Sequence, residues 1–492
     1  MTDRGCKALL ATLLVASMLG EPVNAWVKDD GPQHLNQLHS IGDVLSAGSP
    51  STGGRRPVHI LYVHGIAAKD AGDSQELRKS ICDFLKDPDC DPKKKAEARD
   101  YADTGDFAPD REDPPSFQYL GQPAWKDANE WRASAPFVDH YVLRRQEGQT
   151  IVVDEINWWP LVMPLKCRGL LPDETRLAGP KQDLLKLCAH CTETDEAHTG
   201  RFLYYQWLEQ QRAENLEAMP ANGARLNRIL KANILDWGVS DALMAIGAMR
   251  PYFRDAMRQL FIKSAAYRPD RTAQHDWLKE LRNPSFKDRE FIVVSHSLGS
   301  FLVFSTLDMA LPEPGPGNPA EAASPEEEKD LAARYILERT SLLYFFANQI
   351  PLLELADLQP AEKTPAPQSP AQPTEHPEIY VPKARFGRWQ ALRSRYAEKM
   401  AELGARPPKP PQIVAWSDPS DLLTWRVPEI EGVVVDNLFV RNTWWHWLIA
   451  GPSGAHDNYA RNKDVIRIML KPTSPGPECR RENKRLSGPA HR

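Results

Sequence analysis

Three residues of this chain carry the side chains that together can turn a hydroxyl into a nucleophile: Ser297, Asp421 and His456. A serine hydroxyl reacts poorly until a base removes its proton, and the base needs a third group that holds its tautomer and orientation. A histidine and an aspartate can fill these two roles if the fold brings them to the serine. The three residue types therefore predict nucleophilic catalysis.

The segment around Ser297 has the sequence of a strand that runs through a sharp turn into a helix. Phe291–Val294 is an apolar, β-favouring run, the turn reads SHSLG, and the chain is apolar again over Phe301–Phe304. A serine at the apex of such a turn sits on strained backbone, and its neighbours must be small. Gly299 is the second small residue, and Ser295 stands where the first glycine is usual. The alternative is an ordinary buried strand followed by a turn and a helix.

Other residues could fill the two supporting roles. Asp418 lies in the same loop as Asp421, directly before a proline, where aspartate is common in turns. His446 stands among tryptophans in the sequence WWHW, which is typical of an aromatic packing cluster. His296 directly precedes the serine, but the turn points its side chain elsewhere, so we exclude it as the base.

The motifs that contain these residues resemble those of the α/β-hydrolases. Serine, then aspartate, then histidine is the chain order of that superfamily, and His64-Gly65-Ile66 follows the first strong strand pattern. The loop SDPSDLL at 417–423, with Arg-Val-Pro at 426–428, is similar to the acid loop of class 3-type lipases. In that family the loop runs Asn/Ser-Asp-apolar-apolar and continues to an Arg-apolar-Pro turn. The resemblance covers these motifs and their strands and leaves the intervening insertions unexplained.

The resemblance implies an α/β-hydrolase fold and a role for each of the three residues. Ser297 would be the nucleophile, and Asp421 rather than Asp418 would be the acid. His456, in a His-x-x-Tyr motif just before the last helical stretch, would be the base that Asp421 orients. No cofactor and no metal would be required.

The resemblance also implies the groups that stabilise a negatively charged oxygen. The donors would be the backbone N–H groups of Leu298 and Ile66. His64 would support the loop after the first strand without taking part in the chemistry.

Strands and helices that could position these residues are visible along the chain. The predicted strands are Val58–Val63, Thr150–Ile156, Phe291–Val294, Ser341–Ala347, Pro411–Trp416 and Val433–Phe439. Helices are predicted from Asp73 or Ser74 to Leu85, within 202–263, over Arg385–Leu403 and after Tyr459. The repeated β-α alternation predicts an α/β fold with a mostly parallel central sheet flanked by helices.

The expected boundaries give one catalytic domain with a leader and a tail. Residues 1–25 form the leader, 26–56 a flexible segment, 57–472 the catalytic domain and 473–492 a polar tail. The domain carries insertions near 87–148, 202–285, 312–328 and 359–382. The first is charged and turn-rich, the second is helical and could cap a site or pack on the sheet, and the last two are Pro-rich.

The N-terminus has the features of a secretory signal peptide. Arg4 and Lys7 form a basic start, Ala8–Leu19 is an uncharged apolar run, and Val23–Ala25 offers small residues for cleavage after Ala25. The run is shorter than the about 20 apolar residues that span a bilayer. We expect a periplasmic or secreted protein; an uncleaved anchor or a different start are the alternatives.

Cysteine usage fits export. Six of the seven cysteines lie beyond the leader: Cys82, Cys90, Cys167, Cys188, Cys191 and Cys479. In an oxidising compartment they are disulfide candidates with 15 possible pairings, and Cys82 with Cys90 would close a short local loop. Cys188 and Cys191, with His198 nearby, could instead form half a zinc site, although no second pair stands at the right spacing.

Composition argues against nucleic acid as the partner. The chain has 492 residues, 41% of them hydrophobic, and a formal net charge of −5. These values favour a packed core and disfavour both nucleic acid and an anionic membrane as the main partner. We expect a small-molecule or lipid ester as the substrate, with transient contact with a lipid surface.

These features together predict an exported serine hydrolase that cleaves carboxylic esters, in particular lipid or fatty-acyl esters, through an acyl-enzyme. Thioesterases, amidases and acyltransferases use the same triad and remain alternatives. A non-catalytic binding protein that kept the fold is a further alternative, against which the complete set of three residues argues. Trp158 and Trp159 could line an acyl pocket or belong to the core.

Overall fold

The structure is a computed structural model, and it describes about half of the residues of the predicted catalytic domain. The described residues are 38–46, 57–66, 72–102, 118–119, 122–123, 135–144, 150–162, 238–269, 289–311, 330–357, 388–402, 409–430, 432–440, 442 and 452–471. Several predictions fall outside them: the leader 1–25, the Pro-rich segments 312–328 and 359–382, the pair Cys188 and Cys191, His446, and the tail 473–492.

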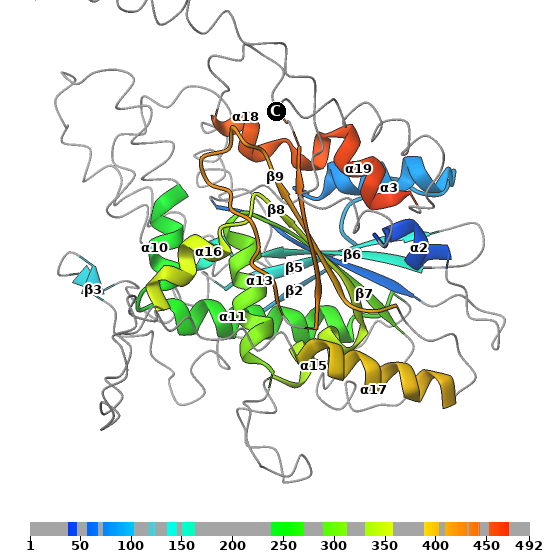
Figure 1. Cartoon of the computed structure of the whole chain (residues 1–492), viewed down its shortest axis with the longest axis horizontal. Helices are drawn as coiled ribbons and strands as arrows, with labels where there is room; N and C mark the ends of the chain where they lie inside the picture. Colours follow the sequence, from blue (N-terminus) through cyan, green and yellow to red (C-terminus); the bar gives the residue numbers. More distant parts are fainter. Residues whose placement is uncertain are drawn as a thin grey trace, which may run out of the picture.

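An eight-stranded, mostly parallel sheet forms the centre of the molecule, in the order β10-β9-β8-β7-β1-β6-β5-β2 (Figure 1). The strands are β1 (Val58–Val63), β2 (Ala98–Tyr101), β5 (Phe137–Arg144), β6 (Thr150–Asn157), β7 (Glu290–His296), β8 (Thr340–Phe346), β9 (Gln412–Ser417) and β10 (Val434–Phe439). In the sheet, each neighbouring pair in the series β10-β9-β8-β7-β1-β6 is parallel. Strand β5 is antiparallel to both β6 and β2. The predicted α/β class and all six predicted strands are confirmed. A separate two-stranded ribbon joins β3 (Gln118–Tyr119) and β4 (Gln122–Pro123).

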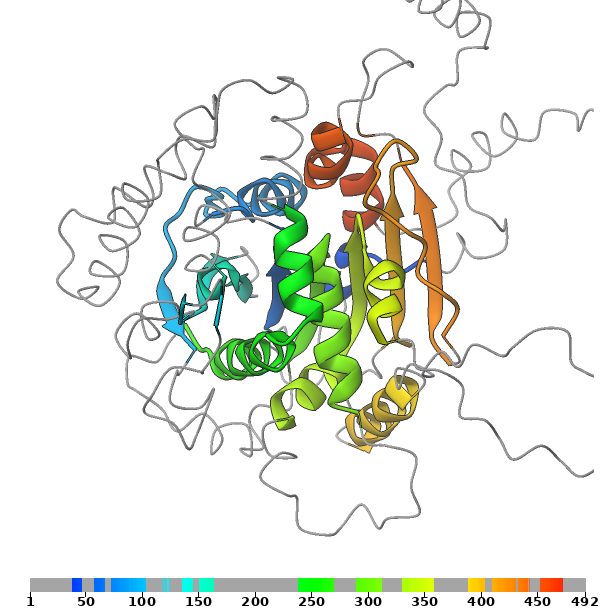
Figure 2. The ribbon, with the colours of Figure 1, turned by 90° about the vertical axis from the view of Figure 1, so that its left-hand side faces the viewer.

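Helices cover both faces of the sheet (Figures 1 and 2). One face carries α2 (Ile41–Ser46), α3 (Gln75–Leu85) and α19 (Lys463–Leu470). The other carries α10 (Ser240–Ile246), α11 (Arg250–Ala266), α13 (Leu298–Met309), α15 (Leu331–Arg339), α16 (Ile350–Leu353) and α17 (Trp389–Glu402). Along β7 the side chains alternate between the layers: Phe291 and Val293 join one core cluster, Ile292 and Val294 the other. Burial on both faces explains why the strands read as continuous apolar runs. None of the helices within the described ranges is long and apolar enough to cross a membrane.

The interval 87–148, predicted to be a turn-rich insertion, instead supplies two strands of the central sheet. These are β2 and β5, which continue the sheet beyond β6. The sequence of β5, FVDHYVLR, contains Asp139 and His140, and both are fully buried. Their polarity interrupts the apolar run by which a buried strand is normally recognised, which is why the pattern did not reveal it.

A buried histidine–aspartate–histidine group joins three neighbouring strands. Asp154 of β6 accepts from His59 Nδ1 of β1 at 3.0 Å and from His140 Nδ1 of β5 at 2.6 Å. Burial disfavours the charged His140 ring, but Asp154, with Asp100, outweighs it and raises the pKa of His140 to about 9. Burial lowers the pKa of His59. Despite burial, the two histidines, His140 first, lower the pKa of Asp154. The group therefore contains one ion pair, Asp154 with His140, beside a neutral His59.

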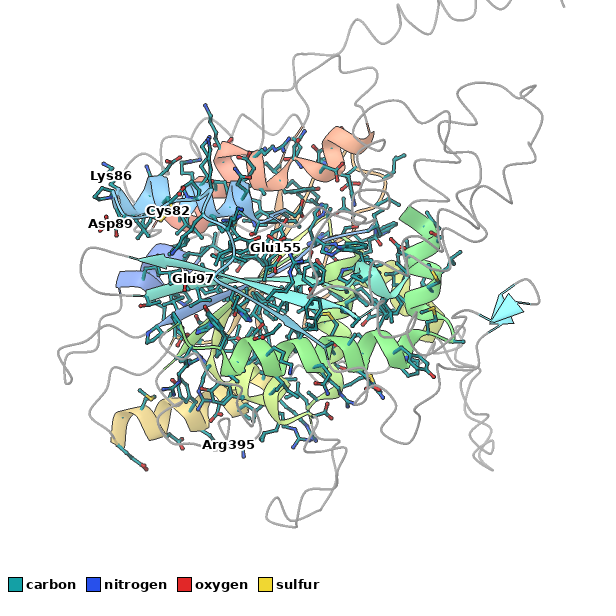
Figure 3. All side chains as sticks on the ribbon, turned by 180° about the vertical axis from the view of Figure 1, so that it is seen from behind. Cys82, Lys86, Asp89, Glu97, Glu155 and Arg395 are labelled. Carbon is teal, nitrogen blue, oxygen red and sulfur yellow. A yellow bond between two sulfur atoms is a disulfide. The ribbon has the colours of Figure 1, made fainter. Side chains whose placement is uncertain are left out.

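Of the candidate disulfides, the one between Cys82 and Cys90 is present and closes the loop after α3 (Figure 3). At the other end of the same helix, the carboxylate of Glu155 accepts from the backbone N–H of Gly72 at 2.7 Å and of Ser74 at 2.9 Å. A carboxylate at a helix N-terminus satisfies backbone donors that lack a helical partner. In Figure 3, Glu155 lies nearer the centre of the molecule than Cys82. The disulfide holds the C-terminal end of α3, and Glu155 holds its N-terminal end.

We expect Asp154→Asn to lower the free energy of unfolding by about 3–5 kcal/mol, because it removes the buried carboxylate that pairs with His140 and leaves only Asp100, 3.3 Å from His140 Nε2. The variant should also change the pH dependence. Since the pKa of His140 rises from 6.5 to about 9 on folding, its contribution to stability is fully present below pH 6.5 and is lost as the pH rises through 9.

Chemical denaturation of wild type and variant below pH 6.5 and above pH 9 measures both effects. Asp139→Asn is the matched control, because Asp139 is also buried on β5 but pairs with Arg99 rather than a histidine. It should keep the loss of stability at high pH. The same alkaline loss in Asp154→Asn would contradict the assignment of the charge to His140.

Candidate active site

Ser297 lies at the apex of the turn between β7 and α13, in a backbone conformation that non-glycine residues rarely adopt. Its φ is 53° and its ψ is −125°. Such a conformation costs about 1–3 kcal/mol and persists only where the surroundings hold it. Two hydrogen bonds do so: the Ser297 N–H donates to the Phe346 carbonyl at 2.8 Å, and the Ser297 carbonyl accepts from the Ser300 N–H at 2.9 Å. The strand–turn–helix context predicted around Ser297 is therefore present.

The two small positions of the turn have different steric demands. A Cβ on Gly299 would lie 2.3 Å from the His64 carbonyl oxygen, so only glycine lets α13 begin against the end of β1. Ser295 is fully buried without a comparable conflict, and its hydroxyl lies 3.2 Å from that of Ser300. The serine at the first small position is therefore compatible with the turn.

The structure brings the three sequence-predicted side chains into one hydrogen-bonded chain. His456 Nε2 lies 2.8 Å from Ser297 Oγ. His456 Nδ1 lies 3.0 and 2.9 Å from the two carboxylate oxygens of Asp421. The serine follows β7, the aspartate lies in the loop after β9, and the histidine belongs to α18 (Pro452–Asp457). All three are buried, so water competes little for these bonds.

Asp418, the alternative acid, faces away from the histidine and holds the loop. Its carboxylate accepts from the N–H of Ser420 at 2.8 Å and of Asn442 at 2.5 Å. Its own N–H donates to the Tyr459 hydroxyl, which in turn donates to Asp421 Oδ2 at 3.2 Å. Burial, and then Asp421, raise the pKa of Tyr459, so the hydroxyl keeps the proton that it donates. The tyrosine of the His-x-x-Tyr motif thus steadies the carboxylate that faces His456.

His296 points away from the serine, as expected, and contacts the histidine from behind. Its Nε2 donates to the backbone carbonyl of His456 at 2.6 Å. The sequence did not reveal this contact, because the two residues are 160 positions apart in the chain. The His296 side chain therefore fixes the backbone of His456.

The loop after β1 is held against the serine. A Cβ on Gly65 would lie 2.8 Å from Ser297 Cβ, so the backbone that leads into Ile66 passes directly beside the nucleophile position. Trp158 Nε1 donates to the His64 carbonyl at 3.1 Å, and the two rings stack. Trp158 and the neighbouring tryptophan belong to the buried core. His64 is thus held by Trp158 in the loop that it was expected to support.

Leu298, the other expected donor, is the first residue of α13. The first N–H groups of a helix have no intrahelical acceptor and carry the positive end of the helix dipole. The N–H at this position can therefore serve a negatively charged oxygen bound next to Ser297.

A fourth side chain, not anticipated from the sequence, contacts the hydroxyl of Ser297. Gln349 Nε2 lies 2.9 Å from Ser297 Oγ, and the residue is only 3% exposed. It follows β8, the strand next to β7 in the sheet. A polar pair, Asn348-Gln349, directly after the predicted strand Ser341–Ala347 is the signal that could have revealed it, because ligands bind beyond the carboxyl ends of parallel strands.

Within the ranges that the structure describes, no group of three or more His, Cys, Asp or Glu side chains could hold a metal ion. The candidate half-site at Cys188 and Cys191 lies outside those ranges.

Comparisons with protein-family models, with curated proteins and with solved structures found no match. The contacts of Ser297, His456 and Asp421 therefore carry the functional assignment.

We expect Asp421→Asn to slow the reaction of Ser297 with an electrophile by about 10³- to 10⁴-fold, because the amide no longer holds His456 in the tautomer that accepts a proton. Asp418→Asn is the matched control from the same loop and should slow the reaction far less, since its carboxylate contacts backbone N–H groups. The measurement is the rate of covalent labelling by a fluorophosphonate. A larger effect at Asp418 would reverse the assignment.

Proposed function

We propose that this protein is an α/β-hydrolase-type serine hydrolase that cleaves carboxylic esters, with lipid or fatty-acyl esters as its substrate class. The observation that carries the proposal is the unbroken hydrogen-bonded chain from Ser297 through His456 to Asp421, with 2.8 Å and 2.9 Å at its two shortest links. The strained backbone of Ser297 supports the same conclusion, because strain of this kind gathers at functional sites. A protein that only binds has no need for either feature.

The geometry supports a two-stage reaction. His456 Nε2 takes the Ser297 proton as Oγ attacks the acyl carbon, and the carbonyl oxygen becomes an oxyanion next to the N–H groups of Leu298 and Ile66. The intermediate collapses, the bond to the alcohol breaks, and the alcohol leaves with the proton from His456. Water then repeats the sequence on the acyl-enzyme and releases the acid. Asp421 orients the imidazole of His456 throughout.

Exposed leucines near the site favour an acyl substrate. Among the described residues the large exposed hydrophobic side chains are Leu243, Leu352, Leu355 and Leu422. Leu422 directly follows Asp421, and the others lie on α10, α16 and the 3-10 helix Glu354–Asp357. Helices α10 and α16 both contact α13, which begins after the nucleophile (Figure 1). Exposed apolar side chains on elements that supply or contact parts of the site suit a substrate with an apolar chain and transient contact with a lipid surface.

The disulfide supports export as part of the proposal. Bonds such as Cys82–Cys90 persist in oxidising compartments and are rare in reducing ones. This agrees with the signal-peptide features of residues 1–25, and we propose a periplasmic or secreted enzyme.

Wild-type protein should label covalently with a fluorophosphonate probe, and Ser297→Ala should not, because the alanine has no oxygen to phosphonylate. Ser295→Ala is the matched control from the same turn and should still label, since its hydroxyl faces Ser300. Gel fluorescence and intact mass measure the adduct. The catalytic hypothesis is lost if the wild type stays unlabelled or if Ser297→Ala labels equally.

A series of nitrophenyl esters tests the substrate class. We expect kcat/KM to rise with acyl chain length by up to about fourfold per methylene buried. Thioesters and anilides with the same acyl group should react more slowly than the ester. An optimum at the acetyl ester would contradict the lipid assignment, and preference for the thioester or the anilide would select one of the alternative activities.

A further inference from the structure

The amide of Gln349 contacts the same oxygen as the general base, and Gln349 lies in the loop after β8, which supplies no member of the triad. Ser297 Oγ lies 2.8 Å from His456 Nε2 and 2.9 Å from Gln349 Nε2. Both partners are buried. A buried amide with hydrogen bonds only to structural groups would be part of the core. The Gln349 amide instead contacts Ser297 Oγ, the atom that reacts in the proposed mechanism.

The proton count at Ser297 decides which half of the amide faces it. The hydroxyl has a single proton, and in the resting triad that proton is directed to His456. Oγ can therefore only accept from Gln349, so the amide presents its NH₂ group. An amide NH₂ has no lone pair available for a proton, and Gln349 cannot replace His456 as the base.

The backbone that carries Gln349 is fixed by contacts that do not involve substrate. Ala347 has a φ of 47° and its N–H donates to the Trp416 carbonyl at 3.0 Å. Asn348 donates from Nδ2 to the Trp425 carbonyl and accepts the Trp425 N–H at 3.0 Å. The Gln349 carbonyl accepts from the Leu353 N–H at 3.0 Å, within α16. The amide is thus aimed at Oγ before a substrate binds, which is the condition under which a donor lowers a barrier.

We propose that Gln349 is a further catalytic residue of this site, an inference that rests on the hydrolase function proposed above. As His456 takes the proton, negative charge grows on Oγ, and the Gln349 N–H already donates there. When the Oγ–carbon bond forms, the carbonyl π electrons move to an oxygen on that same carbon. The amide can then donate to this oxyanion and support Leu298 and Ile66. Collapse of the intermediate sends the electron pair to the leaving alcohol, which takes the proton from His456.

Gln349→Met tests the proposal, because methionine keeps the length of the side chain and removes the donor. We expect kcat for a nitrophenyl ester to fall by about 10²- to 10³-fold, the usual effect of losing one oxyanion donor, with KM changed little. The concentration of reactive sites is measured by end-point titration with the fluorophosphonate. Each rate is divided by this concentration, so unfolded molecules do not affect kcat.

Gln349→Glu is the second variant, since it keeps the shape and replaces the donor by a carboxylate. It should be at least as slow, because a negative charge then faces the developing negative charge. Gln412→Met is the matched control: Gln412 is also buried, but its amide donates to Asp436 at the opposite end of β9 from the acid loop. It should keep the wild-type kcat per site even if its melting temperature falls.

The outcomes separate this inference from the function on which it rests. Failure of the wild type to label or to hydrolyse any ester removes the proposed function itself. If the wild type reacts but either variant at position 349 retains the wild-type kcat per site, Gln349 is structural and the inference is overturned. A loss of kcat matched by Gln412→Met overturns it as well.

Discussion

The strained backbone at Ser297 is the constraint on which the rest of the site depends. A residue with a φ of 53° stays there only if its neighbours leave it no alternative. The Phe346 carbonyl at the end of β8 binds its N–H, and Gly299 allows α13 to begin against the end of β1. Strand β1, strand β8 and helix α13 therefore converge on one residue. The parallel register of β1, β7 and β8 sets the position of the hydroxyl.

A second set of contacts ties the supporting residues to this point. Asn442 donates its backbone N–H to Asp418 and its side-chain amide to the Ala455 carbonyl at 2.8 Å, next to His456. Asn348 binds the backbone of Trp425 in the acid loop. The loops after β8 and β9 are thus bonded through the Asn348 side chain, and those after β9 and β10 through the Asp418 carboxylate. Their mutual positions do not rely on the strands alone, which suits a site in which distances near 3 Å matter.

The sequence revealed the parts of this structure that are local. Fully buried strands give continuous apolar runs, and the turn at Ser297 gives a short motif, so both could be predicted. Strand β5 could not, because Asp139 and His140 are buried there by partners on other strands. The choice between Asp418 and Asp421, the contact of His296 with His456 and the approach of Gln349 to Ser297 all depend on how distant segments meet. Such contacts leave no periodicity in the chain.

The unequal steric demands at the two small positions of the turn bear on how chains with a turn of this kind are found by their motifs. At Gly299 an added carbon would meet a backbone carbonyl at 2.3 Å, whereas a serine is accommodated at position 295. A signature that insists on glycine before the nucleophile would pass over this chain. A signature that allows any small residue at position 295, and requires glycine only at position 299, would retain it. The stringent element of the turn is then the helix-side glycine, because an added carbon there would meet the His64 backbone carbonyl.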